Sequence, residues 1–236
     1  CGIGTWLSVL NKLGVSEIKG FDGAWVDKKT LKISQDCFTV TELDKSVPVD
    51  KKYDLAISLE VAEHLPKESA ALFVDSLTNA SDIILFSAAI PFQGGVNHIN
   101  EQWPEYWDRL FREKEYIAVD FLRRKIWNEK GIAPWYRQNV MIFCKKERLY
   151  EIKVPENDYC LNKPPVSMVL PELYENKISG YERIIEKNHI TVSLKILYKT
   201  GIKRTVKKLV GERIWGLIKA AKTKLRKYKS IENNGE

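Results

Sequence analysis

The first residues of the chain, Cys1-Gly2-Ile3-Gly4-Thr5, place two glycines immediately before a stretch with helical spacing. Glycines let a backbone pass close to a ligand, and the free amides at the start of a helix attract polar groups. An acid follows at Asp22, 18 residues after Gly4 and directly after a predicted strand. In a nucleotide-binding unit, an acid at that place accepts hydrogen bonds from both ribose hydroxyls. The alternatives are an ordinary turn for the glycines and a turn or helix cap for Asp22.

The elements that would position these residues alternate along the chain. Apolar runs predict strands at residues 17–21, 37–39, 53–58, 83–88, 116–121 and 140–144, and helical spacing predicts helices at 5–13, 67–79, 105–114 and 122–128. Strands that alternate with helices indicate βαβ units and a mostly parallel sheet. The last two strands are joined by a segment with a short helix, so we expect them to pair antiparallel at one edge. The sequence therefore predicts an α/β fold.

The stretch Tyr53-Asp-Leu-Ala-Ile-Ser-Leu-Glu-Val-Ala-Glu-His-Leu65 is the most distinctive in the chain. It resembles the fourth-strand motif, F-D-L-V-x-x-x-E-V-x-E-H-L, of the class I S-adenosylmethionine-dependent methyltransferases. Gly2 and Gly4 match the last two glycines of that family's first motif, D-x-G-x-G-x-G. Asp22 matches the acid that closes its second strand, and the pair Glu42-Leu43 resembles the Asp-Leu pair that reads adenine. The resemblance covers residues 1–145 and implies a Rossmann-like sheet.

The same resemblance implies that the first strand of the family precedes Cys1, together with the aspartate and first glycine of the first motif. In the family that strand is central and lies between the second and the fourth. We therefore expect a Rossmann-like fold with its first strand missing. The sheet should show a gap between the strands predicted at 17–21 and 53–58, or these two strands drawn together.

The resemblance also implies S-adenosylmethionine as the cofactor, bound by the residues that match the family's motifs. Asp22 would hold the ribose, Glu42 and Leu43 the adenine, and Glu60 the methionine end, while Gly2 and Gly4 would form the loop around the cofactor. The methyl group of a sulfonium is already activated, so the protein mainly has to bind it, align an acceptor and exclude water. A base is needed when the acceptor is a hydroxyl.

His98 and Glu101 are the predicted catalytic residues. They lie in a glycine-rich loop beyond the carboxyl end of a predicted strand, where open α/β sheets place their ligands. The alternative for His98 is a hydrogen bond that anchors the loop. The His-x-x-Glu spacing also occurs in metal sites, but with 3 His in the chain and no second cluster we predict no metal. Glu63 and His64 are predicted to be helix-start and packing residues, with a catalytic role as the alternative.

The predicted function is methyl transfer to a small-molecule acceptor, a hydroxyl of a sugar or cell-surface glycan precursor. Residues 87–103 and 135–139 support it, because they resemble the loop after strand five and the entry into the last strand in a bacterial branch of the family. No nucleic-acid partner is expected, since Glu60 and its neighbours stand where amide and nucleic-acid N-methyltransferases carry Asn-Pro-Pro-aromatic. Two alternatives stay open: a catalytically degenerate fold acting as a membrane-associated binding protein, and a nucleic-acid methyltransferase.

Charge divides the chain unevenly. Residues 191–236 hold 13 Lys and Arg against 3 Asp and Glu, whereas residues 1–150 are nearly balanced at 20 against 21. We predict a cofactor-binding domain at 1–145, a proline-rich connector at 146–171 and a helical basic tail at 172–236. Within the tail, residues 206–228 have the pattern of a basic amphipathic helix. Such a helix suits an anionic membrane surface, and a helix packed on the domain is the alternative.

Cellular placement follows from composition. The chain is 44% hydrophobic and 29% charged, which excludes a chain disordered throughout, and its 4 Cys are scattered without a C-x-x-C pair. Scattered cysteines are typical of reduced thiols in the cytoplasm. We therefore expect a cytoplasmic protein, with peripheral attachment at the inner membrane face if residues 206–228 bind lipid.

Overall fold

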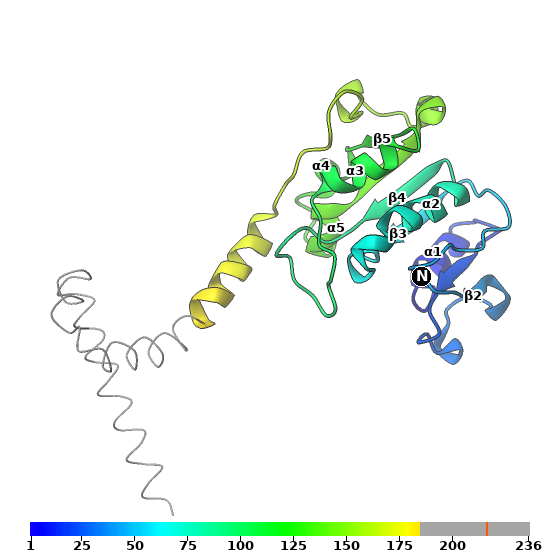
Figure 1. Ribbon diagram of the computed structural model, residues 1–236, viewed down its shortest axis with the longest axis horizontal. Helices are drawn as coiled ribbons and strands as arrows, with labels where there is room; N and C mark the ends of the chain where they lie inside the picture. Colours follow the sequence, from blue (N-terminus) through cyan, green and yellow to red (C-terminus); the bar gives the residue numbers. More distant parts are fainter. Residues whose placement is uncertain (185–215, 217–236) are drawn as a thin grey trace, which may run out of the picture. The chain divides into compact units, whose positions relative to one another are not determined.

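The computed structural model describes residues 1–184 and Gly216, with strands and helices alternating from the first residues (Figure 1). The predicted strands all form, within a few residues of their expected ends. The helices and strands, in chain order, are α1 (Thr5–Lys12), β1 (Gly20–Asp22), β2 (Phe38–Val40), β3 (Ala56–Leu59), α2 (Ala70–Ala80), β4 (Ile83–Ser87), α3 (Pro104–Arg112), β5 (Tyr116–Val119), α4 (Leu122–Ile126), α5 (Pro134–Asn139) and β6 (Met141–Lys145).

The larger sheet has the order β3-β4-β6-β5. Strands β3 and β4 run parallel, with Ala56 opposite Ile84, while β6 runs antiparallel to both of its neighbours. The prediction of an α/β, Rossmann-like fold with a mostly parallel sheet and antiparallel pairing at one edge is confirmed. The strand that runs in reverse is β6, one place in from the edge that β5 forms.

The smaller sheet consists of β1 and β2, which pair in parallel with Gly20 opposite Phe38. Among the described residues no strand pairing joins it to β3, so the sheet is interrupted between β1 and β3. The sequence predicts a gap at this place. Other contacts span the interruption instead. Leu43, which follows β2, belongs to the same buried cluster as the core of the larger sheet, and the backbone amide of Val47 donates to Oγ of Ser76 on α2 at 3.1 Å.

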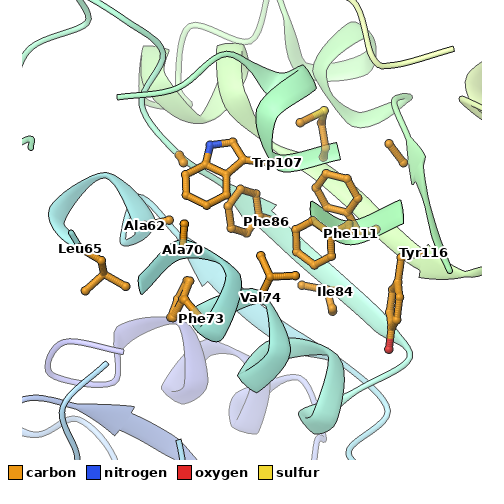
Figure 2. Packing of buried hydrophobic residues seen from close by; sticks show 14 of the residues in the cluster. Ala62, Leu65, Ala70, Phe73, Val74, Ile84, Phe86, Trp107, Phe111 and Tyr116 are labelled. Atoms are coloured by element: carbon orange, nitrogen blue, oxygen red, sulfur yellow. The ribbon is translucent and has the colours of Figure 1, made fainter. Parts of the chain in front are cut away.

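The core lies where α2 and α3 cover the larger sheet, and aromatic rings dominate it (Figure 2). Phe111 of α3 stacks on Phe143 of β6, with ring centroids 3.9 Å apart, and Phe86 of β4 meets both Phe111 and Trp107 edge-on or tilted. Phe86, Phe111 and Phe143 are completely buried. Burying one large apolar side chain stabilises a fold by about 1.5–3 kcal/mol, so this cluster fixes α3 on the sheet.

The segment at 146–171, which the sequence predicts as a connector, contacts α3. Arg112 of α3 donates to the backbone carbonyls of Leu161 at 2.9 Å and Lys163 at 3.0 Å, and also to that of Cys160. Cys160 and Leu170 are buried. The first compact unit accordingly runs from Cys1 to Leu173, and residue 145, the predicted domain boundary, lies inside it. The Arg112 side chain and the burial of Cys160 and Leu170 hold the segment on the domain.

The second unit begins at Tyr174. A helix at 171–184 agrees with the helix expected after residue 171. Within the described residues, no helix is both long and apolar enough to cross a membrane. The basic helix predicted at 206–228 lies outside the described residues, apart from Gly216.

Candidate functional site

The glycine loop is fastened to the end of β1. Oδ2 of Asp22 accepts hydrogen bonds from the backbone nitrogens of Gly2 and Cys1, both at 2.6 Å, and Oδ1 accepts one from the Gly23 amide at 2.8 Å. Two features favour glycine at position 4: its φ is 79°, and a Cβ there would lie 2.8 Å from the side chain of Ile33. Gly2 thus contacts Asp22 directly, while the Gly4 amide donates to the carbonyl of Cys1 at 3.0 Å; the role of these residues toward a cofactor stays a prediction.

The two residues assigned to adenine point differently. Leu43 is buried in the core cluster, while Glu42 is exposed and pairs with Lys45. Both follow β2 directly, and the Thr41 amide donates to the Asp22 carbonyl at 2.9 Å, which keeps this turn beside the end of β1. Their role toward adenine stays a prediction.

Glu60 stands at the carboxyl end of β3 in a network of amide side chains. Its carboxylate accepts hydrogen bonds from Nδ2 of Asn139 at 3.1 Å and from Nε2 of Gln93 at 3.1 Å. Nε2 of Gln138 in turn donates to Oε1 of Gln93 at 3.1 Å. No sequence pattern marks Gln93, Gln138 or Asn139 as site residues, although all three lie in the two segments that resemble the bacterial branch. The network holds the Glu60 carboxylate in one orientation.

The predicted catalytic pair forms, with Nδ1 of His98 3.0 Å from Oε1 of Glu101. Glu101 also accepts hydrogen bonds from the amides of Phe92 at 2.7 Å and Gly94 at 2.6 Å. Its carboxylate therefore holds the loop after β4 and orients the His98 ring. The geometry agrees with the anchoring alternative for this pair, while a catalytic role for either residue stays a prediction.

Glu63 and His64 lie in the short 3-10 helix Ala62–His64. Backbone hydrogen bonds join this helix to the loop that carries His98. The carbonyl of Glu63 accepts from the amides of Ile99 at 2.9 Å and Asn100 at 3.0 Å. The rings of His64 and His98 meet edge to face, with centroids 4.8 Å apart. The sequence assigns Glu63 and His64 to helix start and packing, whereas the structure brings both next to His98.

Backbone strain gathers around the same residues. Glu60, Phe92 and Asn97 have φ of 53°, 68° and 59°, the left-handed region that non-glycine residues seldom occupy. Such conformations cost about 1–3 kcal/mol each and concentrate at functional sites. All three lie in the turns after β3 and β4, so the strain falls on the segments that carry Glu60, His64 and His98.

Two hollows open on another part of the surface. One of about 780 Å³ is lined by Trp103, Tyr106 and Arg109 among others, and one of about 500 Å³ by Arg124, Tyr159 and their neighbours. Neither is lined by Gly2, Asp22, Glu60 or His98. The candidate site is therefore defined by its contacts and not by either hollow.

Comparison with known proteins gives fold likenesses alone. No protein-family model matches the chain, and no curated protein does. Similar solved structures include one described as the small RNA methyltransferase HEN1, with a TM-score of 0.45 and 16% identity over 67% of this chain and 24% of that chain. Another is described as TnmH, with a TM-score of 0.41 and 11% identity over 61% of this chain and 48% of that one. The chain thus spans about a quarter and about half of these two proteins.

Proposed function

We propose that the protein transfers the methyl group of S-adenosylmethionine to a hydroxyl of a small molecule, such as a sugar or glycan precursor. The observation that carries this proposal is the 2.6 Å hydrogen bond between the Asp22 carboxylate and the Gly2 amide. It joins an acid at the end of a strand to a glycine loop that opens a helix, which is the arrangement that nucleotide-binding units use for a ribose and its substituents. The resemblance of residues 53–65, around Glu60, to the fourth-strand motif of methyltransferases supports methyl transfer as the reaction.

The groups around Asp22 suit a nucleoside. Oδ1 of Asp22 accepts one hydrogen bond, from Gly23, and a carboxylate oxygen can accept two, so it retains room for a ribose hydroxyl. Gly2 has open space where a side chain would stand. Gly4 is the N-cap of α1 and offers no side chain to the first amides of the helix, which leaves them free for a ligand. The Glu60 carboxylate suits the ammonium group of the methionine end.

His98 would serve the acceptor. The bound cofactor supplies an activated methyl group, so the protein's share is to hold the acceptor hydroxyl in line and accept its proton. Because the Glu101 carboxylate can only accept a hydrogen bond, the neutral ring carries its proton on Nδ1. Nε2 is then the ring atom with a lone pair. These properties support His98 as the proton acceptor.

Calorimetry with S-adenosylhomocysteine and an analogue lacking the ribose hydroxyls tests the cofactor half of the proposal. The parent should bind the analogue about 10- to 100-fold more weakly, since a hydrogen bond to a charged group contributes about 1.5–3 kcal/mol. In Asp22→Asn the two ligands should bind almost alike. Asp36→Asn, at an exposed aspartate, is the matched control and should discriminate as the parent does. Equal discrimination by Asp22→Asn and the parent would overturn the ribose assignment.

Transfer of a labelled methyl group to a panel of sugars, glycan precursors and RNA or DNA oligonucleotides tests the acceptor half. Label in an alkali-stable ether of a small molecule is the expected result. Label in the oligonucleotides would refute the small-molecule acceptor. Cofactor binding without transfer to any member of the panel would favour the degenerate, non-catalytic alternative.

A further inference from the structure

Three side chains from two separate turns lie together near Glu60. Glu63 and His64 come from the 3-10 helix after β3, and His98 comes from the loop after β4. A carboxylate oxygen of Glu63 and one ring nitrogen of each histidine all lie within 4.8 Å of one another. Ligand atoms that each lie about 2.0–2.2 Å from one ion are at most about 4.4 Å apart, so small side-chain movements would bring the three atoms to coordination distance.

The Glu63 carboxylate is buried without an ion-pair or hydrogen-bond partner of normal geometry. Its side chain is completely buried, and neither oxygen has a hydrogen-bond partner. Leaving an ionised carboxylate in that condition costs several kcal/mol, so such a group has to bind a proton or a cation. A cation that also binds the two imidazoles facing this carboxylate would meet the requirement.

Both histidines are oriented as metal ligands are. Nδ1 of His98 lies 3.0 Å from Glu101, and Nδ1 of His64 lies 3.3 Å from the carbonyl oxygen of Asn97. Both partners can only accept, so each neutral ring carries its proton on Nδ1 and keeps a lone pair on Nε2. Metal-binding histidines characteristically donate their other N–H to a carboxylate or a backbone carbonyl in this way.

The backbone holds the two segments in register. The amides of Ile99 and Asn100 both bond to the carbonyl of Glu63, so the loop that carries His98 is fixed on the turn that carries the other two residues. His64 is exposed, which leaves a route for an ion from solvent. The ligand set is thus prearranged and accessible.

We propose that Glu63, His64 and His98 bind a divalent transition-metal ion, with Glu101 as the partner that orients His98. Two imidazole nitrogens and one carboxylate favour ions such as Zn²⁺, Co²⁺, Fe²⁺ or Mn²⁺ over Ca²⁺, which prefers oxygen ligands alone. Three protein ligands leave at least one coordination position open. The site departs from the metal-free site that the sequence predicts, because the sequence pairs His98 with Glu101 and does not show Glu63 beneath it.

An ion there would change the role of His98. Nε2 would be a ligand and no longer a proton acceptor, and an acceptor oxygen could occupy the open position, where a cation lowers the pKa of a hydroxyl. This use of the ion rests on the proposed methyl transfer. Ion binding itself does not, so it is tested without cofactor or acceptor.

The test is titration of the metal-free, full 236-residue chain with Co²⁺, followed by calorimetry and by the visible absorption of bound cobalt. We expect one ion per chain, without the thiolate bands that binding at the exposed Cys1 would give. Glu63→Gln and His98→Gln should each weaken binding at least tenfold. Glu68→Gln, an exposed glutamate on the next turn, is the matched control and should bind as the parent does. His189, outside the described residues, is unchanged in every variant.

A folding readout accompanies each titration. Co²⁺ should raise the Tm of the parent and of Glu68→Gln, because a ligand that binds the native state alone stabilises it. It should leave the Tm of Glu63→Gln and His98→Gln unchanged while their circular dichroism stays native. Absence of a one-to-one cobalt complex in the parent would overturn the proposal, and so would parental affinity in both variants. The ribose experiment with Asp22→Asn is run without metal, so either result can fail alone.

Discussion

Replacing Gly95 by alanine tests whether His98 has to remain in place. An added Cβ would lie 2.2 Å from Nε2 of His98 and 2.4 Å from Cε1. Non-bonded heavy atoms approach to about 3.5 Å, so the ring has to withdraw by more than ~1 Å. The ring is a terminal group that can rotate away, so the fold should survive while the 3.0 Å bond to Glu101 is lost. Losing such an orienting partner typically costs about 10- to 100-fold in metal affinity.

The assay is cobalt titration of Gly95→Ala together with NMR of the His98 ring. We expect affinity to fall by the factor above and the ring signals to shift, with a change in Tm of only a few degrees. Gly131→Ala is the control, because an added Cβ there has no atom within 4 Å. Parental affinity with unchanged ring signals would refute the reasoning, since it would mean that the imidazole does not lie over Gly95.

Two further predictions concern stability. Lys52 holds the pKa of Asp82 below its ordinary value, so the stability from this carboxylate is present above pH 3.8 and is lost as the pH falls through the lower folded value. Asp82→Asn should therefore lower the free energy of unfolding by up to about 1 kcal/mol at pH 7. Urea denaturation at a series of pH values should show that the variant loses less stability than the parent below pH 4. The same pH dependence in both proteins would contradict this. Phe111→Ala removes the ring stacked on Phe143 and should lower the free energy of unfolding by about 3–5 kcal/mol, and a loss below about 1 kcal/mol in urea denaturation would show that the core repacks.

The strands could be predicted because their apolar runs are short and continuous, as the run at residues 83–87 illustrates. Residues 135–139 illustrate what the motif does not show. The resemblance places them at the entry into the last strand, and β6 begins at Met141, but no helix is predicted there. Pro134 fits the first position of a helix, and α5 forms up to Asn139.

The candidate site divides in the same way. Asp22 and the glycine loop could be predicted because each is marked by its own motif. The contact between Glu63 and His98 could not, because it depends on two backbone hydrogen bonds from Ile99 and Asn100 that leave no pattern in the side chains. Burial of a glutamate without a partner is likewise invisible in composition, which favours exposed glutamates.

The interruption of the sheet between β1 and β3 makes the two ends of the site unequal in local stability. An isolated pair of short strands is marginal in water, and β1 and β2 each comprise three residues. Their amides should therefore exchange hydrogen faster than those of β4, which has a hydrogen-bonded neighbour on each side. The glycine loop and Asp22 belong to the less stable part around β1 and β2, whereas Glu60 belongs to the more stable larger sheet. A ligand that contacts both parts would slow amide exchange in β1 and β2 far more than in β4. Hydrogen exchange would therefore detect its binding as a selective gain of protection in the two-stranded sheet.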